Sequence, residues 1–317
     1  MAVTMQTSST HWLDVMHSNG IRVTSAELMY YRNKVAAFQR HQRLQPPKTQ
    51  TGAILSKHKG RGMEFDEVRH YQAGDDVRSI DWRVTARTGT PHTKLYREER
   101  ERPVMVIVDL GPTLQFGTQL LVKSVQACHL AAALGWLAIS RNDRIGGLIS
   151  SGQDHREVRP QGRQHGMMRL VQALVEQQHR SNDSPTQATQ TLDDLIQRTQ
   201  QVARPGTIVH CISDWLTASH DTFDRLLAIR RHCQLHAYQL TDPFELDMPL
   251  PAASNPLAIT DGLQTPLVMD SQQRNAYLAA MQTKQAELQQ HFQQLGVRPL
   301  RVDAGQALEQ QWAEVMR

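Results

Sequence analysis

A short, wholly apolar stretch that ends in an acidic residue constrains the fold of this chain of 317 residues most strongly. Residues 104–108 read VMVIV, and Asp109 follows them directly. A strand that is apolar on both faces is typical of a sheet that helices cover on both sides. Open α/β sheets bind ligands at the carboxyl ends of their strands, so Asp109 marks a candidate site.

The chain after this strand alternates between strand and helix patterns. Further strands are expected at 144–150, 207–212, 234–240, 267–270 and 297–302, with 155–159 as an antiparallel neighbour of 144–150. Helices are expected at 117–140, 163–180, 187–203, 218–231, 271–295 and 307–316. Because crossovers between parallel strands are right-handed, this alternation predicts the α/β class with a doubly wound, mostly parallel sheet.

The chain before residue 103 has a different character, and we expect three parts. Residues 1–52 contain a helix that starts at a capping box, Thr24 with Glu27, and end in a linker with two adjacent prolines. Residues 53–102 are polar and rich in glycine turns, which predicts a β-rich segment of short strands and loops. Residues 103–317 form the α/β domain.

Charge and hydropathy exclude several classes of protein. The net charge is +4, and residues 60–102 hold nine basic and nine acidic side chains, with most basic residues near acidic ones, so no basic face for nucleic acid is predicted. No run approaches the roughly 20 apolar residues that span a bilayer. The first residues lack the pattern of a signal peptide. We therefore expect a cytoplasmic protein without a transmembrane segment.

Two expected strands end on aspartate, and both ends should lie at the same edge of the sheet. Asp109 follows the first strand and Asp214 follows the strand at 207–212. Hydroxyls of Thr113, Ser213 and a threonine near 186–191 could complete an oxygen shell for Mg²⁺, which prefers oxygen ligands. Aspartates at such places also cap the helices that follow, and the spacing alone favours that role.

Residues 60–87 carry a dense signature. They read GRGMEFDEVRHYQAGDDVRSIDWRVTAR and fit the pattern GxGxEFxExRxYxxGDDxRxIDWxxxAR, and Asp-Pro-Phe-Glu at 242–245 follows a later strand. In these residues the chain resembles the bacterial domain-of-unknown-function family fifty-eight. The resemblance implies a von Willebrand factor type A-like fold, with the signature segment as an added β-rich portion before the first sheet strand.

The resemblance also implies a metal-ion-dependent adhesion site with the motif Asp-x-Ser-x-Ser. Here the motif reads Asp109-Leu-Gly111-Pro-Thr113, so a glycine stands at the first hydroxyl position. Asp214 with Ser213 fits the third loop of such a site, and Thr191 is one candidate for the middle threonine. The resemblance thus implies a degenerate magnesium site at Asp109, Thr113, Thr191, Ser213 and Asp214.

The resemblance also implies a partner, which is a MoxR-type AAA+ ATPase, a client protein, or both. Members of such a family are expected to accompany these ATPases in chaperone-like maturation of other proteins. The chain has no GxxxxGK[ST] phosphate loop. The leading hypothesis is therefore a non-enzymatic interaction module. Its partner surface comes from the signature: Arg61, Glu64, Arg69, Asp75, Asp76, Arg78, Asp81, Trp82 and Arg87. We expect Trp82 to anchor the core of that segment.

A metal-dependent hydrolase is the alternative. Asp75, Asp76, Asp81 and His70 could supply ligands or a general base. Against this hypothesis, the sequence has neither HExxH nor GxSxG.

Overall fold

Six strands form the central sheet of the protein, in the order β10-β7-β6-β3-β4-β5. The computed structural model describes residues 11–43, 63–98, 101–183, 190–248, 258–259, 267–268 and 271–315. The strands of the sheet are β3 (Pro103–Asp109), β4 (Arg144–Ser150), β5 (His155–Gln161), β6 (Ile208–Ser213), β7 (Gln234–Thr241) and β10 (Leu300–Asp303). All neighbours pair in parallel except β5, which is antiparallel to β4. The predicted mixed α/β fold with a mostly parallel sheet is confirmed.

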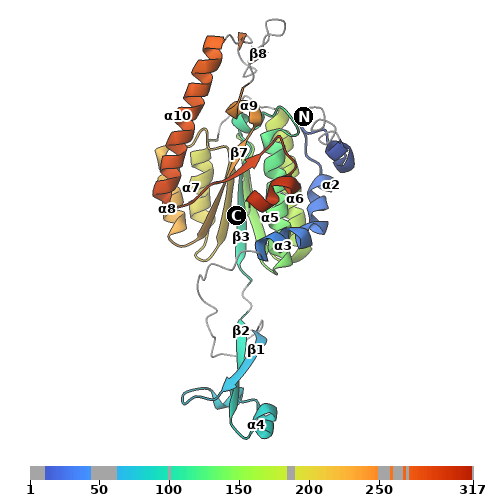
Figure 1. The fold of residues 1–317 in the computed structure, drawn as a ribbon, viewed down its shortest axis with the longest axis vertical. Coiled ribbons are helices and arrows are strands. Elements are labelled where there is room, and N and C mark those ends of the chain that lie inside the picture. Colours follow the sequence, from blue (N-terminus) through green and yellow to red (C-terminus); the bar gives the residue numbers. More distant parts are fainter. Residues whose placement is uncertain are drawn as a thin grey trace. The chain divides into compact units, whose positions relative to one another are not determined.

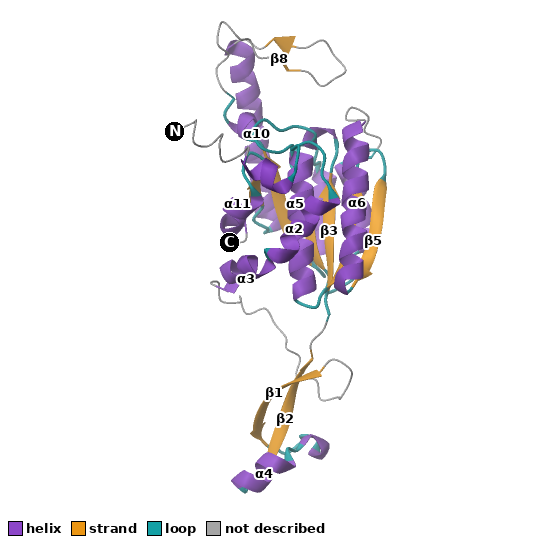
Figure 2. Ribbon diagram, turned by 90° about the vertical axis from the view of Figure 1, so that its right-hand side faces the viewer, coloured by secondary structure: helices purple, strands orange, loops and turns teal. Residues whose placement is uncertain are grey.

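Helices cover both faces of this sheet (Figure 1). One face carries α2 (Ser25–Tyr30), α3 (Val35–Arg43), α5 (Lys123–Ser140), α6 (Arg163–Asp183) and α11 (Leu308–Val315). The other face carries α7 (Leu192–Val202), α8 (His220–Arg230) and α10 (Ser271–Leu295). Figure 2 shows α2, α5 and α6 stacked beside β3 on the first face.

The alternation of side chains along β3 divides the core in two. Val104, Val106 and Val108 point into the cluster under α5 and α6. Met105 and Ile107 point into the cluster under α7, α8 and α10. Successive strand residues face opposite sides of a sheet, so an apolar run on both faces requires a helical layer on each side.

The chain separates into two compact units. One, called here the sheet unit, comprises Met1–Gln45 with Arg102–Arg317, and the other, the signature unit, comprises Pro46–Glu101. The sequence sets residues 1–52 apart from the sheet. In the structure the residues up to 45 group with it, because α2 and α3 pack against α5. The sequence starts the α/β domain at residue 103, and the structure ends the signature unit at Glu101, so the predicted and observed boundaries differ by one residue.

The signature unit is built on an antiparallel hairpin of β1 (Met63–His70) and β2 (His92–Glu98). Between them lie a short 3-10 turn, η2 (Val77–Ser79), and a helix, α4 (Trp82–Thr88). The sequence predicts the strands but not this helix, which begins where Asp81 accepts hydrogen bonds from the first backbone amides. The expectation that Trp82 anchors a core is wrong, since this residue is 66% exposed.

Two elements of the sheet unit start or pair differently from the expectation. The helix expected from residue 117 begins at Lys123, because residues 117–122 form a loop that contacts the ends of other strands. The short strand near 267 does not join the main sheet. It is β9 (Leu267–Val268), which pairs with β8 (Ala258–Ile259) in a sheet of its own. Among the described residues, no helix combines the length and hydropathy needed to cross a membrane.

Candidate functional site at the carboxyl edge of the sheet

Asp109 and Asp214 lie at the point where the strand order of the sheet reverses. Asp109 ends β3 and Asp214 follows β6, and these two strands are neighbours at the centre of the sheet. The chain extends from β3 to one side through β4 and β5, and from β6 to the other side through β7 and β10. Such a reversal opens a crevice beyond the carboxyl ends of the strands, which is where open α/β sheets bind ligands.

Both oxygens of Asp109 have donors in the structure. The backbone amide of Gly111 donates to its Oδ1 over 2.9 Å, and the hydroxyl of Ser213 donates to its Oδ2 over 2.7 Å. The Ser213 hydroxyl in turn accepts a hydrogen bond from the amide of Trp215. A buried carboxylate held by two donors links the end of β3 to the end of β6.

Both oxygens of Asp214 also have donors. The amide of Leu216 donates to its Oδ1 over 3.1 Å. The ammonium of Lys123 donates to its Oδ2 over 2.9 Å and to the Oε1 of Glu245 over 2.6 Å. Lys123 is the first residue of α5, and its exposed fraction is 0%. The carboxyl edge therefore contains a cation that belongs to the chain.

Glu245 reaches Lys123 from the short helix α9 (Pro243–Leu246), which follows β7. A capping box fixes α9: the side chain of Asp242 accepts from the backbone of the first turn, and Glu245 accepts from the amide of Asp242. Asp242 also accepts from both the amide and the hydroxyl of Thr118, in the loop before α5. Three loops thus meet at Lys123.

Burial and charge shift the titration of these groups. Burial, and after it the nearby charge of Asp214, raises the pKa of Asp109 from 3.8 to about 6. Burial also raises the pKa of Glu245. Burial lowers the pKa of Lys123, but the charges of Asp214 and Glu245 outweigh it and leave that pKa above its ordinary value. Lys123 is therefore an ammonium ion at neutral pH.

The backbone beside Asp214 is strained. Trp215 has a φ of 63°, in the left-handed region that side chains other than glycine rarely adopt. Its fully buried ring donates from Nε1 to the carbonyl of Tyr238 and packs against Phe292. Strained residues of this kind persist only where the surrounding packing holds them, and they cluster at functional sites.

The predicted magnesium ligands gather only in part. Asp109, Ser213 and Asp214 come together as expected from the strand ends. Thr113 lies partly buried in the 3-10 turn η3 (Pro112–Leu114). Thr191 is the N-cap of α7, where it forms a capping box with Asp194. Its hydroxyl is therefore committed to a helix terminus.

These residues do not fit a divalent cation. All four oxygens of Asp109 and Asp214 accept hydrogen bonds, and the ammonium of Lys123 holds one of them. A Cβ atom at Gly111 would lie 3.0 Å from Oδ1 of Asp109. The absence of a side chain at Gly111 lets its backbone amide approach this oxygen and donate to it. In the part of the chain that the structure describes, no three His, Cys, Asp or Glu side chains form a group that could hold a metal ion.

The residues proposed for a partner surface lie in the signature unit, except that Arg61 and the side chain of Glu64 lie outside the described residues. Its three central acids have structural partners. Asp75 pairs with Arg69 at 2.7 Å, Asp76 accepts from the amide of Arg78, and Asp81 caps α4. Arg78 and Arg87 lie exposed in η2 and α4. Trp82, 66% exposed, and Val77, 57% exposed, are apolar side chains that face solvent.

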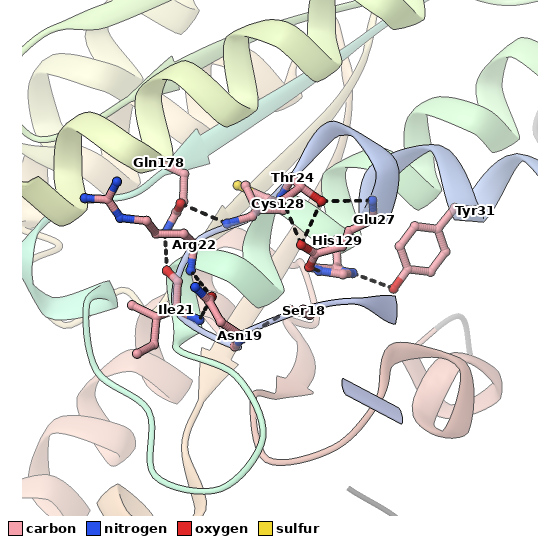
Figure 3. A network of polar contacts seen from close by, with 12 residues as sticks. Ser18, Asn19, Ile21, Arg22, Thr24, Glu27, Tyr31, Cys128, His129 and Gln178 are labelled. Atoms are coloured by element: carbon pink, nitrogen blue, oxygen red, sulfur yellow. Dashed lines mark hydrogen bonds and ion pairs between the residues drawn. The ribbon is translucent and has the colours of Figure 1, made fainter. Parts of the chain in front are cut away.

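A second buried polar cluster joins the N-terminal residues to α5 (Figure 3). Glu27, predicted as part of a capping box with Thr24, forms that box and also lies 3.3 Å from Nε2 of His129. The other ring nitrogen of His129 lies 2.8 Å from the hydroxyl of Tyr31. Burial raises the pKa of Glu27, but the hydrogen bond and charge of His129 outweigh it and leave that pKa below 4.5.

Sequence reasoning missed Lys123 and Glu245. Lys123 stands in the run LLVKSVQACHL, as the one charged residue of a segment that is otherwise apolar or uncharged. A lone lysine in a helix that is buried all round requires an anionic partner. That requirement was the available signal. Glu245 is the last residue of the Asp-Pro-Phe-Glu turn. That turn is visible in the sequence, but nothing in it indicates which residue Glu245 contacts.

Residues 67–287 match the family described as "Protein of unknown function DUF58". "Uncharacterized protein Rv1480" from Mycobacterium tuberculosis and "Uncharacterized protein Mb1516" from Mycobacterium bovis are each 32% identical to this chain over 193 residues. The match covers 60% of this chain and 58% of each relative, so the chain spans less than two thirds of these relatives.

Two solved structures resemble the protein at low sequence identity. A conserved hypothetical protein BatB from Bacteroides thetaiotaomicron is 12% identical, with a TM-score of 0.38, and the match covers 68% of this chain and 97% of that one. An aerotolerance-related membrane protein from Bacteroides fragilis is 13% identical, with a TM-score of 0.36, and the match covers 68% and 98%.

Proposed function

This chain belongs to the DUF58 family, and on that premise we propose that it is a non-enzymatic protein-interaction module that acts with a MoxR-type AAA+ ATPase in chaperone-like maturation of other proteins. We further propose that its sheet unit is a von Willebrand factor type A-like domain. The partner contacts the signature unit through the exposed face that carries Trp82.

The order of the strands supports a von Willebrand factor type A-like domain. Five parallel strands and one antiparallel edge strand, β5, form the sheet, and helices lie on both faces. Asp109 ends β3 and Asp214 follows β6, which are the first and fourth strands of this sheet in chain order and lie on the two sides of the reversal in strand order. This arrangement agrees with the fold that the signature of residues 60–87 implies.

The observation that carries the proposed interaction is the exposure of Trp82. A tryptophan that gives two thirds of its surface to solvent gains free energy when a partner buries it, and tryptophan is enriched among the residues that dominate binding energy. Trp82 is the first residue of α4, and Asp81 next to it caps that helix by accepting from the amides of Arg83 and Val84. The exposed ring is therefore carried on a defined helix start beside a charged residue, and interfaces commonly surround such apolar residues with polar ones.

The same geometry weakens the hydrolase alternative. A metal ligand or general base needs a carboxylate whose oxygens are available to a metal or a substrate. Asp75, Asp76 and Asp81 each accept hydrogen bonds from nearby backbone amides, and Asp75 also holds an arginine. His70 packs against His92, its partner across the hairpin, at a ring-centroid distance of 4.4 Å.

A binding measurement tests the proposal. The purified full chain is immobilised, and a MoxR-type AAA+ ATPase of the same organism is passed over it. We expect saturable binding, weakened at least about tenfold by Trp82→Ala, since truncating such a residue costs about 2 kcal/mol or more. Leu227→Ala, on the exposed surface of α8, is the matched control and should bind like the wild type.

The outcomes separate the parts of the proposal. Absence of binding to the ATPase contradicts the proposed partner. Binding that Trp82→Ala leaves unchanged contradicts the proposed surface. Turnover of phosphoesters or peptides by the isolated chain with added Mg²⁺ or Mn²⁺ would favour the hydrolase, provided that Asp75→Asn or Asp81→Asn abolishes it.

A further inference from the structure

Arginine side chains gather at the edge of the sheet where the parallel strands begin, called here the amino edge. The segments that lead into or out of the sheet at this edge are residues 101–102, 141–144, 162–163, 203–207, 231–233 and 296–299. Each of them carries at least one arginine, and together they contain Arg102, Arg141, Arg144, Arg163, Arg204, Arg231 and Arg298. All of these arginines are exposed.

Few acidic groups balance the arginines of the amino edge. The segments contain two carboxylates, Glu101 and Asp143, and Asp143 is buried and accepts from the backbone amide of Arg102. The last turns of α5, α7, α8 and α10 and the first turn of α6 lie beside these segments and contain no Asp or Glu. At the carboxyl edge the loops have the opposite character: they hold five acids and no Lys or Arg in residues 110–122, 151–154, 214–219, 242–247 and 304–307.

Helix termini account for part of this positive charge. A cation near the carboxyl end of a helix is favoured by the helix dipole, by about 0.3–1 kcal/mol. Arg141, Arg204 and Arg231 stand directly after such helix ends. Arg163 does not, because it is the first residue of α6, where the dipole favours anions. The fold therefore explains several of the arginines but not this one.

The backbone of Arg163 is also strained. Its φ is 61°, in the left-handed region that glycine adopts freely and other residues rarely do. Its side chain is exposed and makes no ion pair with any residue that the structure describes. Strained residues of this kind cluster at functional sites. An arginine kept at such a position, without a contact that supports the fold, indicates a role in binding.

The chemistry of the amino edge fits an acidic polypeptide. Every Lys or Arg residue in its segments is an arginine, and the guanidinium group binds a carboxylate through two parallel hydrogen bonds. Six strands about 4.8 Å apart span roughly 24 Å, which is the length of about seven extended residues. The segments contain no Phe, Tyr or Trp on which the bases of a single-stranded nucleic acid could stack.

We propose that the amino edge of the sheet is a second interaction surface, which binds an extended segment rich in Asp and Glu on a partner protein. Arg163, Arg204 and Arg231 bind the carboxylates of that segment. This inference concerns the sheet unit and does not depend on the ATPase proposed as the partner of the signature unit.

The test measures binding of a fluorescein-labelled decaglutamate peptide to the full chain by fluorescence anisotropy. We expect saturable binding that weakens as the salt concentration rises, and no binding of decaglutamine. Replacing Arg163, Arg204 and Arg231 together with glutamine should weaken binding at least about tenfold, because three charge-assisted contacts are lost. Trp82→Ala should bind decaglutamate like the wild type, so the result is independent of binding to the ATPase.

A control variant removes the same amount of charge elsewhere on the sheet unit. Arg22, Arg156 and Arg180 are exposed and lie outside the segments of the amino edge. Replacing these three with glutamine should leave the affinity for decaglutamate nearly unchanged at physiological salt, where charges more than about 8 Å away are largely screened.

A single variant separates binding from folding. Glycine adopts a φ of 61° without strain, so Arg163→Gly should unfold at the same temperature as the wild type or a higher one. The same variant should bind decaglutamate about two- to fivefold more weakly, as expected for the loss of one exposed ion pair.

Each other result overturns the proposal. Absence of decaglutamate binding, or equal losses in the two triple variants, would mean that the amino edge is not the binding surface. Tighter binding of a DNA duplex of equal charge, or of phosphatidylserine vesicles, would mean that the edge recognises a nucleic acid or a membrane. A lower unfolding temperature for Arg163→Gly would mean that Arg163 serves the fold.

Discussion

The hydroxyl of Ser213 donates a 2.7 Å hydrogen bond to Oδ2 of Asp109. This contact joins the ends of β6 and β3 on the two sides of the reversal in strand order. With the ion pairs of Lys123 to Asp214 and to Glu245, it connects the central strands to α5 and α9. The carboxyl edge is thus closed by hydrogen bonds and one internal cation.

Replacing Ser213 should destabilise the fold more than replacing a comparable serine. Ser213→Ala removes a buried hydrogen bond to a carboxylate and should lower the free energy of unfolding by about 2 kcal/mol. Ser150, equally buried at the end of β4, accepts from the neutral amide of Gly152. Ser150→Ala should cost about 1 kcal/mol. Urea unfolding at pH 7 measures both costs. Equal costs would contradict a hydrogen bond from the Ser213 hydroxyl to an ionised Asp109.

Asp109 should make stability fall as pH rises. Its pKa is about 6 in the folded chain and 3.8 unfolded, so folding favours the protonated form. The contribution of Asp109 is complete below about pH 4 and is lost as pH rises through about 6, a total of about 3 kcal/mol.

Asp109→Asn provides the reference for this measurement, because an amide does not titrate. The difference in unfolding free energy between wild type and variant, taken from urea unfolding between pH 4 and pH 7.5, should shift in favour of the variant as pH rises. A difference that does not change over this range, or that shifts toward the wild type, would show that the pKa of Asp109 is not raised.

The cluster of Glu27 and His129 should behave as one unit. Each side chain is buried and lies 3.3 Å from the other (Figure 3). Glu27→Leu or His129→Leu leaves the remaining partner buried without its contact, and each should cost about 3 kcal/mol. The double variant should cost at least about 1 kcal/mol less than the sum of the two single variants. Additive costs would mean that the pair contributes no coupling energy.

Gly111→Ser restores the hydroxyl at the degenerate motif position and tests whether the glycine or the lysine closes the edge to metal. The φ of Gly111 is −60°, which a serine adopts without strain, although its Cβ would lie 3.0 Å from Oδ1 of Asp109. With Lys123 present, we expect Gly111→Ser not to bind Mn²⁺ in a calorimetric titration. Mn²⁺ binding by this single variant would show that the lysine is not the barrier.

The fold was predictable because its signals are local and repeated. Apolar runs of five to seven residues alternate with helical patterns, and right-handed crossovers then leave few ways to order the strands. The antiparallel neighbour at 155–159 is confirmed as β5. The sequence predicts a start of α5 at 117 rather than at Lys123, because Leu120, Leu121 and Val122 continue the apolar pattern of the helix. The hydrogen bonds that hold this loop reach residues distant in sequence, which no local pattern shows.

The site was only half predictable from the sequence. Asp109, Ser213 and Asp214 follow from strand ends, because parallel strands bring their carboxyl ends together. Lys123 and Glu245 were missed because they enter the edge from a helix start and a short turn, and no periodic pattern places such residues. Trp82 was misplaced because aromatic side chains in dense motifs usually fill cores, whereas α4 turns this one toward solvent.

A crystal structure of the wild-type chain soaked in Mn²⁺ tests most directly the claim that the chain supplies its own cation. The account predicts no anomalous manganese peak between Asp109 and Asp214, with the Lys123 ammonium in contact with both Asp214 and Glu245. A manganese peak coordinated by Asp109 and Asp214, with the Lys123 side chain displaced, would contradict it.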